Sequence, residues 1–202
     1  MSTLLFLRDV ARRPLEMGAI LPSSTQLAIA MVREARIEPG QRVLELGAGS
    51  GSFTREIVRC HPNNPLWLVE PGQDLGGALS AEFPHATVCT CTAEALGAQV
   101  PSGVTFDRVV SGLPWALWPI ERQAAILDGL LSVLAPDARL VTFHYVHSRM
   151  LGRVASLRKL LQERFQEVTQ SESVWSNVPP AYVHIASAPK PVGDRHTNAA
   201  VV

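Results

Sequence analysis

The stretch VLELGAGSG, residues 43–51, constrains the fold of this chain more than any other segment. An apolar run ends in three glycines at alternate positions, Gly47, Gly49 and Gly51, and a helical pattern follows them. A buried strand that turns tightly into a helix is typical of α/β proteins with parallel sheets. Because glycine lacks a Cβ, the turn also lets a ligand approach the backbone closely. The segment therefore predicts a strand–loop–helix unit with a ligand at its turn.

Strand-like and helical patterns alternate along the rest of the chain. This alternation predicts a mostly parallel, seven-stranded sheet with helices on both faces, which binds its ligand at the carboxyl ends of the strands. Strands are expected at residues 41–46, 66–70, 86–91, 106–111 and 138–145, with a closing pair at 165–175 and 181–188; helices are expected at 2–13, 23–35, 50–60, from 71 to about 82, 119–134 and 148–164.

The 202 residues suit one domain, and neither a repeat nor a linker divides them. We expect N-terminal helices over residues 1–35 and the main α/β domain over residues 36–187. A disordered tail is expected over residues 188–202, where the composition turns polar and rich in Pro and Gly.

Composition excludes several classes of function. Eighteen basic and 18 acidic residues give no net charge, which argues against a nucleic-acid binder that depends on phosphate neutralisation. The three cysteines and six histidines show no metal-ligand spacing, so we expect no metal site and reduced cysteines, as in the cytoplasm. No apolar run is long enough to span a bilayer, and the N-terminus lacks the features of a signal peptide.

A second feature strengthens the interpretation of the glycine loop. Glu70 ends the next predicted strand, about twenty residues after the glycines. A carboxylate at that place can accept hydrogen bonds from both hydroxyls of a ribose. The alternative is an ordinary solvated glutamate at a strand end.

In this order and spacing, VLELGAGSG, LVEPG and FDRVVSGLP resemble the class I S-adenosylmethionine-dependent methyltransferases. The resemblance covers roughly residues 41–145 and implies their Rossmann-like fold and their cofactor. It implies that the glycine loop packs against the methionine part of S-adenosylmethionine, that Glu45 helps hold its ammonium group and that Glu70 holds the ribose.

The adenine end of the cofactor is expected near residues 91–96, CTAEAL. Ser111, the last residue of the fourth strand, is also an expected cofactor-binding residue. The family often has an aspartate after the third strand, and Thr92 stands in its place here. Ala93 and Glu94 are then the expected neighbours of the adenine.

The segment SGLPWALWP, residues 111–119, lies at the expected place of the methyl acceptor. It resembles the Asn-Leu-Pro-aromatic motif of adenine N6-methyltransferases, but Gly112 replaces the asparagine and offers only its backbone carbonyl. The chain also lacks a basic helical extension. RNA adenine methylation is therefore the disfavoured alternative, and no nucleic-acid partner is expected.

A closer resemblance is to bacterial soluble phospholipid N-methyltransferases, which convert phosphatidylethanolamine towards phosphatidylcholine. Four segments carry it: RRPLEMGAILPSS, SGLPWALWP, RLVTFHY and VWSNVPPAYVHIA. Family members usually have Phe-Thr-Tyr where this chain has Phe143, His144 and Tyr145. The resemblance implies an amine acceptor; a small-molecule N-methyltransferase and a non-enzymatic cofactor-binding protein are the alternatives.

Aromatic side chains suit such an acceptor, since a methylated ammonium binds well to aromatic faces. We expect Trp115 and Tyr145 to contact the acceptor, together with the Gly112 carbonyl. Trp118 is expected either there or in the core. The histidines at 144 and 147 could move protons, but strand-end histidines are more often structural, and we expect neither to be essential.

The predicted first helix, residues 2–13, alternates apolar residues with Arg8, Arg12 and Arg13. Such a helix can lie in a lipid interface or can cover its own domain. The family resemblance favours the interface, and hence a cytoplasmic protein bound peripherally to the inner face of the membrane.

Overall fold

The computed structural model describes residues 24–191, and the expected helix over residues 2–13 and the end of the expected tail lie outside this range. Seven strands form one sheet in the order β3-β2-β1-β4-β5-β7-β6, in which only β7 pairs antiparallel with its neighbours. The predicted class of fold is confirmed. The strands are β1 (Val43–Leu46), β2 (Leu66–Val69), β3 (Thr87–Cys89), β4 (Phe106–Ser111), β5 (Leu134–Tyr145), β6 (Phe165–Gln170) and β7 (Ala181–Pro189).

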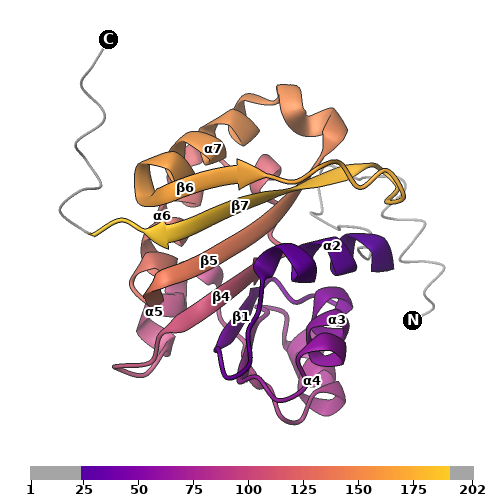
Figure 1. The fold of residues 1–202 in the computed structure, drawn as a ribbon. Helices are drawn as coiled ribbons and strands as arrows, with labels where there is room; N and C mark the ends of the chain where they lie inside the picture. Colours follow the sequence, from indigo (N-terminus) through magenta and orange to yellow (C-terminus); the bar gives the residue numbers. More distant parts are fainter. Residues whose placement is uncertain (1–23, 192–202) are drawn as a thin grey trace.

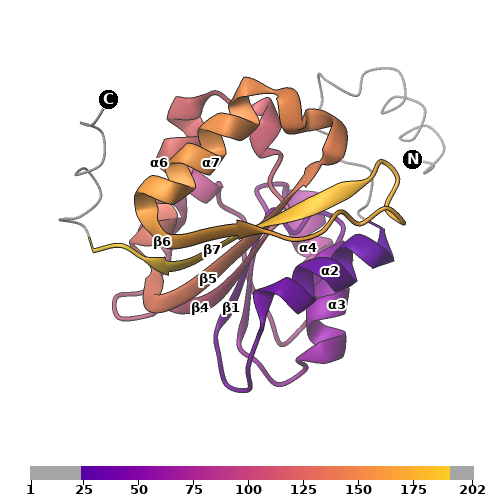
Figure 2. The same cartoon turned by 45° about the horizontal axis from the view of Figure 1, so that its top comes forward.

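Helices cover both faces of the sheet (Figures 1 and 2). On one face lie α2 (Thr25–Ala35), α3 (Ser52–Cys60) and α4 (Gln73–Glu82), and on the other lie α5 (Leu96–Gln99), α6 (Ile120–Leu131) and α7 (Gly152–Arg164). Short 3₁₀ turns stand at three strand ends: η1 (Ala93–Ala95), η2 (Trp115–Leu117) and η3 (Val146–Met150).

Two apolar cores follow from the period-two alternation of the strands. Val141 and Phe143 of β5 face α2 and α3, whereas Leu140, which precedes them, faces α6 and α7. Since both faces are covered, the central strands are buried throughout, which explains why β1 is apolar at nearly every position.

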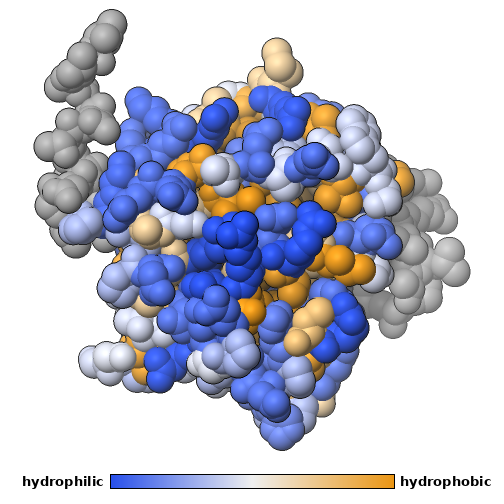
Figure 3. Space-filling model, in the orientation of Figure 1, coloured by the Kyte–Doolittle hydropathy of each residue, from blue (hydrophilic) through white to orange (hydrophobic). Residues whose placement is uncertain are grey.

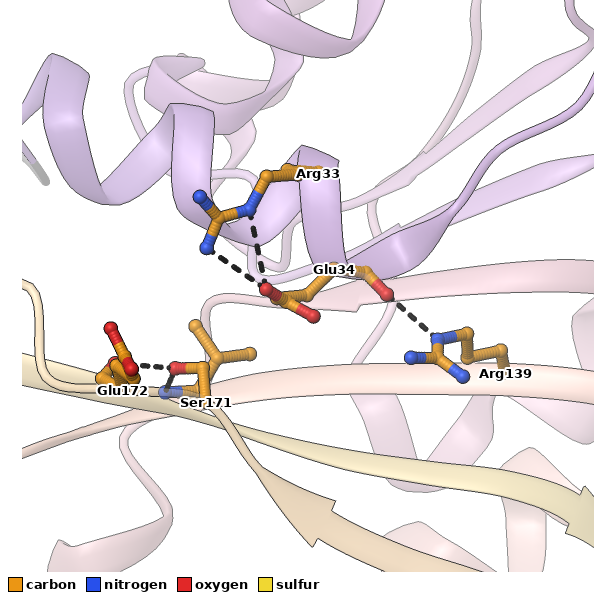
Figure 4. Close-up of polar contacts among 6 residues, drawn as sticks. Arg33, Glu34, Arg139, Ser171 and Glu172 are labelled. Atoms are coloured by element: carbon orange, nitrogen blue, oxygen red, sulfur yellow. Dashed lines mark hydrogen bonds and ion pairs between the residues drawn. The ribbon is translucent and has the colours of Figure 1, made fainter.

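The backbone of helix α2 is hydrogen-bonded to strand β5, inside the sheet (Figure 4). Arg139 on β5 donates from Nε to the carbonyl oxygen of Glu34 over 2.7 Å, and the Glu34 carboxylate pairs with Arg33 at 2.9 Å. In the same view, the Ser171 hydroxyl donates to the carbonyl oxygen of Glu172 at the start of the β6–β7 loop. The hydrogen bond from Arg139 thereby attaches α2 to β5, the strand next to the antiparallel β7.

Several boundaries differ from the expected ones, four of them in the second half of the sheet and its helices. Strand β5 begins at Leu134, because Leu134 already pairs with Phe106 of β4. The register then shifts before Arg108 pairs with Arg139, and this irregularity accommodates Pro136. Strand β6 ends at Gln170, after which Val174 makes only an isolated bridge. The expected helix 148–164 begins as η3 before α7, and β7 continues to Pro189, two residues beyond the expected end of the domain at 187.

Candidate active site

The glycine loop joins β1 to α3 in a left-handed backbone. Gly47, Gly49 and Gly51 have φ values of 72°, 54° and 80°, which side chains other than glycine rarely adopt. A Cβ on Gly47 would lie 2.8 Å from Leu113 Cδ2, and one on Gly51 would lie 3.1 Å from Phe83. At Gly49 the nearest atom would be the Gly47 oxygen at 4.0 Å. Gly47 and Gly51 thus have no room for a side chain, whereas Gly49 borders a space that the described residues leave open above the loop.

Glu70, at the carboxyl end of β2, lies against this loop. Its Oε2 accepts from the backbone N–H of Gly49, and its Oε1 accepts from that of Gly72, each over 2.9 Å. The side chain is buried. The acid predicted from its place after the second strand is therefore beside the open space at Gly49, where a ligand with hydroxyl donors would reach both oxygens.

Glu45 on β1 is fully buried and only partly hydrogen-bonded. Thr54 on α3 donates its hydroxyl to Oε2 over 2.7 Å, while Oε1 has no partner. Burial raises the pKa of Glu45 to about 8, although the hydrogen bonds from Thr54 act in the opposite direction. A buried carboxylate oxygen without a partner fits a cationic ligand group, since an ammonium would both neutralise and hydrogen-bond it.

The turn after β3 carries the residues expected beside adenine. Ala93 is buried, and Glu94 pairs with Arg122 of α6 over 2.7 Å. Burial raises the pKa of Glu94, but hydrogen bonds from its own backbone and from Arg122 outweigh it and hold the pKa below its usual range. Glu94 is thus charged and already paired. Its role toward a cofactor stays a prediction.

Trp115 is a core residue in this structure. Its side chain is 1% exposed and packs among the apolar residues of α6 and β4. Its indole Nε1 donates to Ser111 Oγ over 3.1 Å, and the backbone N–H of Leu113 donates to the same oxygen at 3.4 Å. The expectation that Trp115 presents a face to the acceptor is therefore not met, and the Ser111 hydroxyl serves this turn.

Trp118 is partly exposed, but one of its faces is covered. The guanidinium of Arg122 lies 4.1 Å from the ring centroid, and the ring meets Trp115 edge-on at 6.1 Å. A second cation cannot use the covered face. The two tryptophans therefore form an edge-to-face pair that packs against the turn, and they do not form an open aromatic cage.

Gly112 is pressed against the glycine loop. Its N–H donates to the carbonyl oxygen of Leu46 over 2.8 Å, and an added Cβ would lie 2.9 Å from the Gly47 oxygen and 3.3 Å from the Phe53 ring. The turn after β4 approaches the loop after β1 so closely that any side chain would push them apart. The backbone carbonyl of Gly112 stays a candidate acceptor of an amine hydrogen bond.

An aromatic row runs from this point toward the end of β5. The rings of Phe53 and Phe143 lie 5.9 Å apart, Phe143 meets Tyr145 at 5.5 Å, and Tyr145 stacks on His147 at 5.5 Å with an interplanar angle of 8°. Burial raises the pKa of Tyr145, so its hydroxyl stays protonated. Tyr145 is thus placed by this row on the sheet face that also carries Glu45.

His144 points to the opposite face and contacts a second histidine that the sequence did not single out. His184 on β7 meets the His144 ring edge-on at 5.1 Å. Both are buried, and neither nitrogen of His144 nor Nε2 of His184 has a partner. Burial, followed by the neighbouring His184, lowers the pKa of His144 to about 3; burial, followed by Arg158 and Arg149, lowers the pKa of His184 to about 4.

This pair predicts sensitivity to acid. Because both pKa values lie below the ordinary 6.5, the unfolded chain binds the protons first, and stability that is complete above pH 6.5 is lost as pH falls toward 4. Each histidine should contribute about 1.4 kcal/mol per pH unit to this loss. Urea unfolding from pH 7 to 4.5 should show a flatter dependence in His144→Gln/His184→Gln, whereas His85→Gln, at an exposed position, should not change it. An unchanged dependence in the double variant would contradict the prediction.

Within residues 24–191, no group of three or more His, Cys, Asp or Glu side chains could hold a metal ion. Over the same range, no helix is both long and apolar enough to cross a bilayer.

Thr54, Arg122 and Asn177 also matter to the arrangement, and sequence reasoning passed over them. The Asn177 side chain accepts from the Ser24 hydroxyl and donates to the Pro179 carbonyl, so it joins the start of α2 to the β6–β7 loop. The Asn-x-Pro-Pro-Ala run was a signal for this residue, since it marked the loop as unusual. Thr54 and Arg122 lie on ordinary helix patterns that carry no such signal.

No protein-family model matches the chain. Among curated proteins, the ornithine lipid N-methyltransferase of Singulisphaera acidiphila is 28% identical over 158 residues, which are 74% of this chain and 82% of that protein. Ribosomal RNA small subunit methyltransferase A of Maridesulfovibrio salexigens is 33% identical over only 72 residues, 36% of this chain and 27% of that protein.

Solved structures share the fold. The N-methyltransferase NodS of Bradyrhizobium japonicum in complex with S-adenosyl-L-homocysteine gives a TM-score of 0.62 at 15% identity, covering 91% of this chain and 98% of that one. An S-adenosylmethionine-dependent O-methyltransferase of Thermotoga maritima gives 0.64 at 15% identity, covering 92% of this chain and 72% of that one. The chain therefore has the fold that these methyltransferases share, and its sequence is similar to that of a lipid N-methyltransferase over most of both chains.

Proposed function

We propose that this enzyme methylates the amine of a membrane lipid headgroup, with phosphatidylethanolamine and its partly methylated forms as substrates on the way to phosphatidylcholine. The observation that carries the proposal is the match to a lipid N-methyltransferase across 82% of that relative's length. Phosphatidylethanolamine and ornithine lipid both present an amine as nucleophile, so the relative supports the class of acceptor.

The cofactor would be held by the residues around the glycine loop. Gly49 leaves room for it, Glu70 would accept from the ribose hydroxyls, and the free Oε1 of Glu45 would accept from the ammonium of the methionine part. When bound, S-adenosylmethionine supplies a sulfonium methyl group that a neutral amine attacks. Ala93 and Glu94 remain the proposed neighbours of the adenine.

On the acceptor side, the amine must be unprotonated when it attacks and must lose a proton again before another methylation. Tyr145 keeps a neutral hydroxyl, because burial raises its pKa, so it can accept from or donate to the amine without adding charge. The Gly112 carbonyl offers a second acceptor at the neighbouring strand end. Trp115 and Phe143 are buried and Arg122 covers one face of Trp118, whereas Tyr145 and His147 are at least partly exposed. These two rings are the aromatic surface that we propose for a methylated ammonium.

The packing at Gly112 argues against the adenine N6-methylation to which the sequence motif is similar. That chemistry would require an amide side chain at this place, and an added Cβ would lie 2.9 Å from the Gly47 oxygen. The matches to ribosomal RNA methyltransferases are also short. Nucleic acid is therefore not the proposed substrate.

For location, we propose a cytoplasmic enzyme bound peripherally to the inner face of the membrane. The expected amphipathic helix at residues 2–13 supports this, although it lies outside the described part of the chain. The supporting physical argument is that a two-chain lipid does not leave its bilayer readily, so the enzyme has to work at the surface.

A single assay tests the proposed function. The full chain is incubated with methyl-labelled S-adenosylmethionine and vesicles that contain phosphatidylethanolamine, ornithine lipid or neither, and the lipids are separated. Label in mono-, di- and trimethylated ethanolamine lipids is the expected result. Label only in ornithine lipid would move the proposal to that headgroup, and label in neither, with soluble amines or RNA labelled instead, would overturn it.

Tyr145 provides a second test. Because its hydroxyl is the group proposed to orient the amine, Tyr145→Phe should lower turnover by roughly 10- to 100-fold while cofactor affinity stays nearly unchanged. The chain contains one other tyrosine, Tyr182, which is buried in the sheet with Arg149 against its ring. Tyr182→Phe is the matched control and should retain turnover. Full activity in Tyr145→Phe would leave that residue a packing role only.

A further inference from the structure

The exposed apolar side chains of this protein are gathered at one corner. Of the seven large apolar residues that stand exposed among residues 24–191, four lie on η3 or the β6–β7 loop: Met150 at 94%, Leu151 at 48%, Trp175 at 71% and Val178 at 85%. In Figure 3, apolar side chains show between hydrophilic ones over α2 and towards this loop. Single exposed apolar residues need no explanation, but a group of four does.

The two segments leave the sheet from neighbouring points, so the four residues lie at the same end of the sheet. The backbone N–H of Val146 donates to the carbonyl oxygen of Pro180 over 2.8 Å, and Tyr145 pairs with Ala181 between β5 and β7. Val174 bridges to Ala181 within the same loop. We call this surface, formed by Met150, Leu151, Trp175 and Val178, the apolar rim.

The charge around the apolar rim is positive. Residues 146–162 contain four basic residues, Arg149, Arg153, Arg158 and Lys159, and no acidic residue. The β6–β7 loop, residues 171–180, contains one charged residue, Glu172. Arg149 directly precedes Met150, Arg153 follows Leu151 after one glycine, and both arginines are exposed. This composition, apolar tips between exposed arginines, is complementary to a bilayer with anionic headgroups.

The shape of the rim favours a bilayer over a protein partner. The four side chains stand on two separate segments rather than on one flat helix or sheet face, whereas a stable protein interface needs about 1,000 Å² of matched surface over both partners. A bilayer needs no complementary surface, and a few inserted side chains with adjacent arginines suffice for reversible binding. Tryptophan is also the residue type typical of the membrane–water interface.

We propose that the apolar rim docks onto an anionic bilayer and thereby turns the acceptor side of the enzyme toward the lipid headgroups. Tyr145 immediately precedes η3, so the rim begins where the proposed acceptor contact ends. Ser24, the first described residue, is hydrogen-bonded to Asn177 of the β6–β7 loop and so lies at this corner as well. This inference rests on the proposed lipid substrate for its purpose, but its test does not.

The test uses Trp175 as a reporter in the full chain. Vesicles of phosphatidylcholine with 30% phosphatidylglycerol (a composition roughly matching an anionic leaflet) contain no primary amine, so binding is measured without turnover. Brominated acyl chains should quench the fluorescence of the wild-type protein, and Trp175→Phe should remove most of that quenching. Binding should weaken with salt and on pure phosphatidylcholine.

Substitutions then separate the rim from other contacts. Met150→Ser and Val178→Ser should each lower vesicle affinity by about tenfold or more, because a buried apolar side chain is lost from the lipid. Leu75→Ser, at a 43% exposed position on α4 beside the opposite half of the sheet, is the matched control and should bind like the wild type. Arg149→Gln/Arg153→Gln should bind more weakly and with a smaller salt dependence.

Three outcomes would overturn the proposal: rim variants that bind vesicles as well as the wild type, quenching that persists in Trp175→Phe, or a wild-type dimer that the rim substitutions dissolve. Each differs from failure of the proposed function, in which vesicles bind as expected but no lipid becomes labelled. Methylation of a short-chain lipid below its micelle concentration should survive in the rim variants if the rim serves the membrane alone.

Discussion

Replacing Gly49 by valine should abolish measurable binding of S-adenosylmethionine, with a loss of affinity of at least 100-fold. An added Cβ would project into the space above the loop, where the Gly47 oxygen is the one atom of residues 24–191 within 4 Å. The side chain would stand beside the Glu70 carboxylate. A β-branched residue at φ 54° is also strained, by about 1–2 kcal/mol. Titration calorimetry with the cofactor measures the effect.

Gly103 supplies the control for strain. It has a φ of 82° and, like Gly49, empty space where a Cβ would stand, but it lies in the turn before β4. Gly103→Val should therefore lower the melting temperature about as much as Gly49→Val does and leave cofactor affinity intact. Equal affinities in the two variants would show that the space above Gly49 is not the cofactor site.

The sequence predicted the parts of this site that local pattern determines. Gly47, Gly49 and Gly51 need a left-handed backbone wherever such a strand turns into such a helix, and Glu70 follows the second strand directly. The alternation of apolar runs likewise predicted the sheet, since buried parallel strands are apolar on both faces. The beginning of β5 was missed because Pro136 normally ends a strand, whereas here an irregular register accommodates it.

The direction of side chains after a strand end could not be predicted in the same way. Trp115 follows the acceptor-like motif at once, but the turn of η2 directs its indole back to Ser111 and into the core. The pairing of His144 with His184 depends on the antiparallel register of β5 and β7, which joins residues forty positions apart. The free oxygen of Glu45 depends on how α3 packs on β1, and the sequence carries no mark of it.

Binding of the cofactor should release a proton from Glu45 and should strengthen as pH rises. Because burial raises the pKa of Glu45 to about 8, the side chain is mostly neutral at pH 7. An ammonium beside its free Oε1 requires the carboxylate, so binding at pH 7 should release about 0.9 proton and affinity should rise nearly tenfold from pH 6 to 7, levelling off above pH 8. Calorimetry in two buffers of different ionisation enthalpy counts the protons.

Glu45→Gln is the decisive comparison, because it keeps the shape and the hydrogen bond from Thr54 but cannot ionise. The cofactor affinity of Glu45→Gln should be lower than that of the wild type and should not rise between pH 6 and 8. Titration of the cofactor's own amine affects both proteins equally and so cancels in the comparison.

The stability of the cofactor-free protein should depend on pH in the opposite direction. With the folded pKa of Glu45 above the ordinary 4.5, the stability that the protonated acid contributes at low pH is lost as pH rises through 8. Glu45→Gln should therefore melt higher than the wild type at pH 9 without cofactor, yet gain less from adding it. A wild type that releases no proton and matches Glu45→Gln at every pH would remove Glu45 from the site.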